Sequence, residues 1–408
     1  MCEKETRAKH SKNGLGDGMV LSKTDLDMIV AYKYKPGAYT HLDNLLTPFW
    51  NWAVTLLPMW MAPNLVTFIG LVGTAFAALL LTSYSPGLDG PVPRWCSALF
   101  ALALFIYQTL DAIDGKQARR TNSSSPLGQL FDHGCDTVVK VLSSVAMSAN
   151  LGVGPTCSAI VVFSIVEGVF YMAQWEEYHT GTLNWSNGWV GVTESQFVQM
   201  GLFLTSACFG QEVWQMIVPG TTSVTVLKAM IWSLVPLAMA MVASNFRKVW
   251  ASKPEDLPVE ERGRKTIGVW PGVLQLLAMG LTMGLGFLLT MGPAVPVFVK
   301  HTGLQLFMLG TVTTHLTSRM IVNHMAKSAL SVQDLTCSSL LVLVAVALNV
   351  YWPTLGAGGP SPVDPEVALF IGSAVALVSY LRYVRGVVTD ICGRLGIECF
   401  RIKHSRAD

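Results

Sequence analysis

Long apolar runs recur along the whole sequence, and they constrain its fold more than any other feature. A helix needs roughly 20 apolar residues to cross a bilayer. Only 13% of the residues are charged, whereas a soluble domain carries about 25%. The sequence therefore predicts an all-α polytopic membrane protein with about ten transmembrane helices. The apolar runs lie at about 65–83, 96–113, 134–152, 156–176, 192–209, 224–246, 267–290, 297–318, 334–352 and 366–388.

The basic residues are distributed unevenly between alternate loops. They gather in the polar segment 1–41, in the loop 247–265 and in the tail 391–408, whereas the intervening loops are rich in Gly and Pro. Positive loops stay in the cytosol. Because residues 1–41 also lack the pattern of a secretory signal, we expect both ends of the chain and these loops to be cytosolic.

Residues 42–62 differ from the membrane-spanning runs. Their Leu, Phe and Trp residues recur near the helical period, which is typical of an amphipathic helix lying in the interface. We therefore predict an interfacial helix over 42–62, followed by a six-span region at 63–246 and a four-span region at 266–390. The chain shows no internal repeat, which argues against a transporter built from inverted halves.

Charge and cysteine spacing exclude two other classes of site. The formal net charge is only +2, so binding to nucleic acid is not indicated. The eight cysteines form no CxxC pair, so neither a zinc site nor a disulfide framework is expected.

Four aspartates stand where apolar runs begin or end, and ionisable residues at membrane depth indicate a functional site. Asp111 and Asp114 are three residues apart, and Asp132 and Asp136 are four apart, so each pair shares one helix face. Pro126 and the preceding polar residues break the helix between the pairs. The two faces can therefore meet and gather all four carboxylates.

Such a cluster needs cations to relieve its repulsion. Oxygen-only ligands suit Mg²⁺ or Mn²⁺, and two such ions are a recurring device for displacement at phosphorus. Arg119 could neutralise a phosphate, and the small residues Gly115, Ala118 and Gly128 permit close approach of a ligand. In the alternative interpretation the aspartates only cap helices or pair with nearby cations in a solvated loop.

These residues fill every fixed position of D-x2-D-G-x2-A-R-x8-G-x3-D-x3-D, and in this the chain resembles the CDP-alcohol phosphotransferases. Over nearly its whole length it also resembles their eukaryotic choline/ethanolamine phosphotransferase branch. The segments that carry this wider resemblance are WMAPNLVTFIGL, WEEYHTGTL, TVTTHLTSRMIVNHMAKS and CFRIKH.

The resemblance implies an activity. Phosphoethanolamine or phosphocholine would pass from its CDP ester to the 3-hydroxyl of diacylglycerol, with phosphatidylethanolamine or phosphatidylcholine and CMP as products. We expect both headgroups to be accepted. We expect the protein to be located in the endoplasmic reticulum or Golgi membrane, with its active site towards the cytosol. A homodimer is one assembly to test.

The resemblance also implies residue roles. Two Mg²⁺ or Mn²⁺ ions would be held by the four aspartates, and Arg119 would meet the phosphates. The CDP pocket would be lined by Asn64, Gly115, Ala118 and Gly128.

A base must take the proton of the acceptor hydroxyl, and two assignments remain open. His133 lies between two of the aspartates and has a suitable ordinary pKa, with Glu194 as the carboxylate that would orient it. In the other assignment Asp136 is the base, and Glu194 is simply a carboxylate at the start of a helix.

Two alternative functions also remain. One is a phosphatidyltransferase that uses CDP-diacylglycerol with a small polar acceptor. The other is a cation-coupled transporter whose intramembrane carboxylates bind ions.

Overall fold

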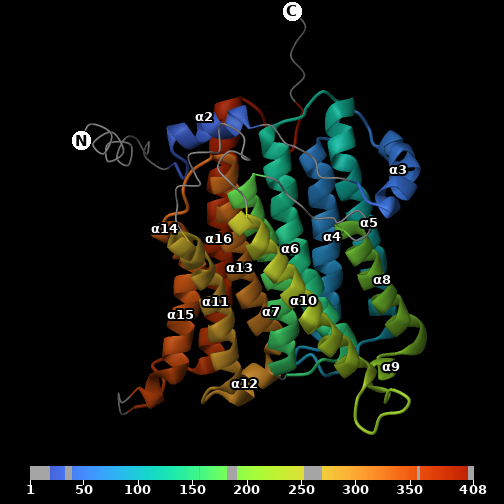
Figure 1. The fold of residues 1–408 in the computed structure, drawn as a ribbon, viewed down its shortest axis with the longest axis vertical. Coiled ribbons are helices and arrows are strands. Elements are labelled where there is room, and N and C mark those ends of the chain that lie inside the picture. The colour runs from blue at the N-terminus through green and yellow to red at the C-terminus, as the bar shows by residue number, and fades with distance from the viewer. Residues whose placement is uncertain are drawn as a thin grey trace, which may run out of the picture.

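All regular elements in the described part of the chain are helical, as the apolar runs predict, and the long helices stand side by side in one bundle (Figure 1). Most of the predicted loop 247–265 and most of the segment 1–41 lie outside the described residues, as does the end of the predicted tail. The computed structural model describes residues 19–32, 39–155, 157–181, 191–251, 269–355 and 359–402.

Within the described residues, ten long helices coincide with the ten apolar runs. They are α4 (Pro63–Tyr84), α5 (Arg94–Arg120), α6 (Pro126–Leu151), α7 (Cys157–Thr180), α8 (Val192–Phe209), α10 (Val226–Ala251), α11 (Val269–Met291), α13 (Thr302–Met325), α15 (Ser338–Tyr351) and α16 (Pro365–Leu395). Shorter elements are α2 (Lys23–Ala31), α3 (His41–Ala53), η1 (Val54–Leu56), α9 (Glu212–Gln215), α12 (Val295–Lys300), α14 (Val332–Leu335) and η4 (Trp352–Thr354).

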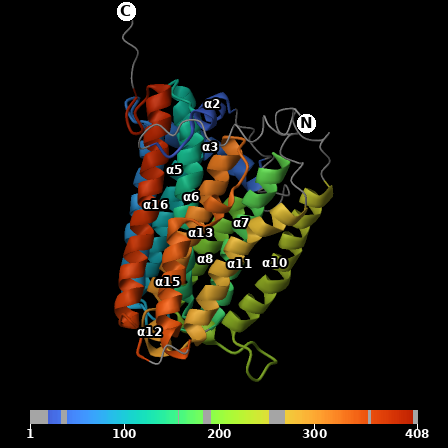
Figure 2. The same cartoon turned by 90° about the vertical axis from the view of Figure 1, so that its left-hand side faces the viewer.

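Six of the long helices in the described residues are both long and apolar enough to cross a membrane on their own: α4, α5, α7, α10, α11 and α16. Two of the others, α6 and α13, are more polar because they face protein. From Val141 to Leu151 every residue of α6 is buried, and nearly all of α13 is buried as well. The all-α polytopic architecture is thus confirmed, with the buried helices α6 and α13 at its centre (Figure 2).

The two central helices pack closely at one glycine. A Cβ atom at Gly310 of α13 would lie only 2.2 Å from a methyl carbon of Val141 on α6. Any larger residue would therefore push the helices apart. This contact fixes α6, which carries half of the aspartate motif, against the middle of the bundle.

A buried ion pair joins the same centre to α7. The Lys140 Nζ atom on α6 lies 2.8 Å from Glu167 Oε2 on α7, and Thr313 Oγ1 on α13 donates to the same oxygen at 2.6 Å. The Glu167 side chain is fully buried. Because a buried charge is costly unless paired, these contacts hold three helices together below the aspartates.

The predicted interfacial helix corresponds to α3 and η1, which end earlier than the prediction, at residue 56. A capping box begins α3, with Thr40 Oγ1 accepting from the Asp43 amide and Asp43 Oδ2 accepting from the Thr40 amide. Leu45, Trp52 and Leu56 are largely exposed. An exposed apolar face on a helix beside the bundle is typical of an interfacial location.

A further helix, α2, lies across the end of α16 (Figure 1). It is capped by Ser22 and Asp25, and its apolar side buries Leu26 and Ile29. Asp390 on α16 accepts hydrogen bonds from two amides just before α2, and Arg394 pairs with Asp27 at 2.7 Å. The sequence interpretation had no helix here, because α2 is short and most of its contacts are to the other end of the chain.

The Lys140–Glu167 pair generates a stability prediction. Glu167→Gln leaves the lysine charge buried without a partner, which costs about 3–5 kcal/mol. We expect a clear fall in the unfolding temperature of the detergent-solubilised protein, and a smaller fall in the double variant Lys140→Met/Glu167→Gln. The matched control is Lys300→Met, because the Lys300–Glu366 pair is largely exposed. Equal stability of Glu167→Gln and Lys300→Met would contradict the structural role of the buried pair.

Candidate active site

The site lies at the reversal between α5 and α6, at the end of the bundle that carries α2 and α3, here called the site end. The α5 helix continues through the first half of the motif to Arg120, and α6 begins at Pro126. Between them Asn122 has a φ of 52°, and Ser125 caps α6 by accepting from the Gly128 amide. The predicted helix break is therefore confirmed, and both aspartate pairs lie within regular helix.

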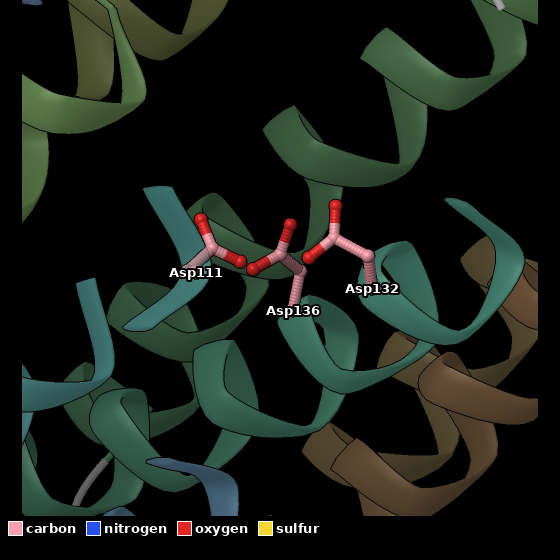
Figure 3. Close-up of side chains that lie close together, drawn as sticks. All are labelled: Asp111, Asp132 and Asp136. Atoms are coloured by element: carbon pink, nitrogen blue, oxygen red, sulfur yellow. The ribbon is translucent and has the colours of Figure 1, made fainter. Parts of the chain in front are cut away.

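Three of the four carboxylates converge (Figure 3). Asp111 comes from α5, Asp132 and Asp136 come from α6, and one oxygen from each lies within 4.8 Å of the others. Asp114 stands slightly apart, with its Oδ2 accepting a hydrogen bond from Thr67 Oγ1 on α4. The geometry thus reproduces the predicted meeting of the two helix faces.

The cluster fits a divalent cation. Asp111 Oδ1 and Asp132 Oδ1 are buried, and neither has a hydrogen-bond partner among the described residues. Buried carboxylate oxygens without donors are unfavourable unless a cation satisfies them. An all-oxygen donor set is the type that Mg²⁺ and Mn²⁺ prefer.

Two hydroxyl groups hold the carboxylates, and sequence reasoning missed both. Tyr107 donates to Asp136 Oδ1 at 2.8 Å, and Thr67 donates to Asp114. The Tyr107 ring is fully buried, and Gly70 on α4 leaves room for it, since a Cβ there would lie 3.1 Å from the ring. The available signal was helical spacing, because Tyr107 stands one turn before Asp111 on α5.

A cavity of about 820 Å³ opens beside the cluster, a size that suits a small-molecule ligand. Its walls come from the starts of α4 and α6, the end of α5, Tyr32 and the residues after α16. Asp111 and Asp136 do not line it, but they neighbour Asp132, which does. The predicted site residues that line it are Asn64, Asp114, Gly115, Ala118, Arg119, Gly128, Asp132 and His133.

The basic residues at the end of α5 have different surroundings. Lys116 donates to the Asn51 side chain at 2.9 Å, and Arg120 donates to the carbonyls of Val54 and Leu57 at 2.8 and 2.7 Å. These contacts fasten the interfacial region to the bundle. Of the three cations on this turn, only Arg119 lines the cavity.

Glu194 lies at the start of α8, where its Oε2 accepts from the Gly191 amide at 2.8 Å. It therefore caps the helix, and it is not among the residues that line the cavity. The structure thus does not place Glu194 with the other predicted site residues. Its pairing with His133 stays a prediction.

Comparison with known proteins identifies the family. Residues 60–227 match the sequence profile of the CDP-alcohol phosphatidyltransferases. Over 392 residues the chain is 37% identical to human cholinephosphotransferase 1, and the aligned region covers 93% of this chain and 89% of the relative. The chain belongs to the CDP-alcohol phosphatidyltransferase family.

Two other relatives extend across nearly the whole chain. Choline/ethanolaminephosphotransferase 1 of Arabidopsis thaliana is 33% identical over 402 residues, covering 92% of this chain and 96% of the relative. Cholinephosphotransferase 1 of Xenopus laevis is 31% identical over 393 residues, and the aligned region covers 95% of this chain and 92% of the relative. This membership makes the chain an enzyme of the CDP-alcohol phosphatidyltransferase type and sets the transporter alternative aside. It also agrees with the metal-binding character of the aspartate cluster.

The two hydroxyl donors generate a prediction about metal affinity. Groups that hold metal ligands in place typically contribute about 10–100-fold to metal affinity. Tyr107→Phe and Thr67→Val should therefore raise the Mn²⁺ concentration needed for half-maximal turnover of a CDP-alcohol by about tenfold.

Thr74→Val is the matched control for this measurement. Thr74 is also buried on α4, but its hydroxyl donates to the backbone of its own helix at Gly70. If Thr67→Val and Thr74→Val have the same metal requirement, the hydroxyl at residue 67 does not position Asp114.

Proposed function

We propose that this enzyme transfers phosphocholine and phosphoethanolamine from CDP-choline and CDP-ethanolamine to the 3-hydroxyl of diacylglycerol, releasing CMP. The observation that carries the proposal is a nucleotide-sized cavity bordered by clustered aspartates within a membrane bundle. The printed names of the relatives supply the substrate class, because they are cholinephosphotransferases and choline/ethanolaminephosphotransferases.

Backbone exposed in the cavity wall would admit the CDP ester. Gly128 and Asn64 both line the cavity, and a Cβ atom at Gly128 would lie 3.7 Å from Asn64 Oδ1. A Cβ atom at Gly115 would similarly lie 3.7 Å from a terminal nitrogen of the Arg119 guanidinium. Arg119 can then reach a phosphate oxygen without crossing a bulky side chain.

The four aspartates would hold two divalent ions, either Mg²⁺ or Mn²⁺. When bound, such ions neutralise the pyrophosphate and the leaving CMP. The protein's own part is to keep the carboxylates together: Tyr107 orients Asp136, and Thr67 orients Asp114. This preorganisation means that the ligands need not rearrange during the reaction.

His133 is the proposed base. It lines the same cavity as Asp114 and Asp132, where an imidazole nitrogen can accept the proton of the attacking hydroxyl. Asp136, the alternative, does not line the cavity and already accepts the Tyr107 hydroxyl. Glu194 as the partner of His133 rests on the family resemblance alone.

A second, apolar cavity supports a lipid acceptor. It has a volume of about 170 Å³ and lies between α4, α6, α13 and α16. Gly134 and Cys135 line it, and they stand on α6 between Asp132 and Asp136. The exposed side chains of Phe68 and Leu381 also line it, so it reaches the outer surface of the bundle. An acyl chain of diacylglycerol in this cavity would lie beside the reacting phosphorus.

The charge distribution supports a cytosolic site in an endoplasmic reticulum or Golgi membrane. Cations cluster at the site end of α5, α13 and α16, whereas Arg94, Lys228 and Lys300 are at the opposite end. By the positive-inside rule, the site end faces the cytosol.

In the decisive assay, purified protein is incubated with one labelled substrate at a time, either CDP-choline, CDP-ethanolamine or CDP-diacylglycerol. Each substrate is combined with its possible acceptors. We expect CMP release from the first two with diacylglycerol, loss of activity in EDTA and recovery with Mg²⁺ or Mn²⁺. Asp114→Asn and Asp132→Asn should release no CMP although they remain folded. Activity that persists in EDTA contradicts the metal proposal, and turnover of CDP-diacylglycerol alone contradicts the proposed substrates.

The base assignment generates a separate prediction. General-base catalysis contributes about 10²–10⁴-fold, so His133→Ala should lower kcat by that factor and still bind CDP-choline. The kcat is measured with CDP-choline and diacylglycerol together. Binding is measured by titration with CDP-choline in the absence of diacylglycerol. Unchanged turnover of His133→Ala would give the base role to Asp136.

A further inference from the structure

The last described residues of the chain form one wall of the large cavity. After α16, Gly396 adopts a left-handed conformation with a φ of 68°, and the chain turns across the site end. The segment Ile397–Ile402, here called the C-terminal wall, follows. All of its residues except Phe400 line the cavity.

Two contacts fix the C-terminal wall to the start of the catalytic region. Arg401 forms an antiparallel β-bridge with Met61, just before α4. The Asn64 side-chain amide donates to Cys399 Sγ at 3.7 Å, across a sequence separation of 335 residues. The wall is therefore held against the nucleotide side of the site, and Asn64 is itself a predicted CDP-binding residue.

Phe400 explains why the other residues of the wall face the cavity. Its ring centroid lies 5.2 Å from that of Phe68 on α4 and 5.5 Å from that of Phe131 on α6. Aromatic pairs at such distances are favourable. The ring thus anchors the wall to two helices, while its neighbours line the cavity.

The charge of the cavity gives Arg401 a specific use. Asp114, Asp132 and Glu398 line the cavity, and such acidic surroundings disfavour an anionic pyrophosphate unless cations offset them. Arg119 and Arg401 are the two Lys or Arg side chains among the residues lining this cavity. Within the part of the chain that the structure describes, Arg401 makes no ion pair.

The geometry points to the C-terminal wall as a nucleotide-binding element, with Arg401 as a second phosphate-contacting cation beside Arg119. This inference rests on the proposed function, because that function supplies the CDP ester. The family profile ends at residue 227. Asp114 and Asp132 thus lie within the profile, whereas the C-terminal wall, which carries Glu398 and Arg401, lies outside it.

Binding of CDP-choline without diacylglycerol tests Arg401. Loss of one charge-assisted contact typically weakens binding about tenfold or more. Arg401→Ala should therefore raise the Kd for CDP-choline and the KM for the same substrate by about tenfold, while the KM for diacylglycerol stays unchanged. Arg401→Lys should recover part of the affinity. The matched control is Arg394→Ala, since Arg394 pairs with Asp27 and does not line the cavity.

Two truncations test the wall as a whole. Ending the chain after Gly396 removes the wall, whereas ending it after Ile402 keeps every described contact. We expect the shorter chain to lose CDP-choline affinity and the longer one to behave as the full chain. If both truncations and Arg401→Ala have the same KM for CDP-choline as the full chain, the inference is wrong. The proposed function would still stand in that case, provided that the full-length enzyme is active.

Alkylation of Cys399 gives a readout that needs no turnover. Burial raises the pKa of the Cys399 thiol to about 11, so its reaction with N-ethylmaleimide should be slow. Peptide mass spectrometry should show CDP-choline slowing it further, and Phe400→Ala accelerating it by releasing the wall. The exposed Cys208, which does not line the cavity, is the internal control. A Cys399 rate unaffected by saturating CDP-choline overturns the inference.

Discussion

The structure depends on bringing four carboxylates together where water is scarce. Like charges repel strongly in a low-dielectric interior, so the fold must hold each aspartate in place and leave room for cations. Helix geometry aligns the two pairs, and the break before Pro126 turns α6 back along α5. Hydroxyls from Tyr107 and Thr67 fix two of the carboxylates. The close packing of α6 on α13 holds α6, and with it Asp132 and Asp136, in a fixed position in the bundle.

Much of this could be predicted from the sequence, because the relevant signals are local. Apolar runs of membrane length predicted the positions of the ten long helices in the described part of the chain. The spacings of three and four residues placed Asp111 with Asp114 and Asp132 with Asp136, and Pro126 marked the reversal. Local periodicity also located α3, although its end came earlier than expected. Each of these features depends on residues that are near neighbours in the chain.

The remaining features depend on contacts between distant segments, which local patterns do not reveal. Lys116, Arg119 and Arg120 look alike in sequence, yet two of them fasten the interfacial region and only Arg119 lines the cavity. The Thr67 hydroxyl acts across 47 residues. Glu194 caps its own helix through the Gly191 amide, and its pairing with His133 stays a prediction.

The separation between Asn64 and Cys399 has a consequence for biosynthesis. The aspartate motif is made early in translation, but Cys399, which meets Asn64, is made 335 residues after Asn64. A nascent chain therefore carries all four aspartates while one side of the cavity beside them is still missing. Synthesis of residues 397–402, and not synthesis of the aspartate motif, is therefore the step at which the cavity can become complete.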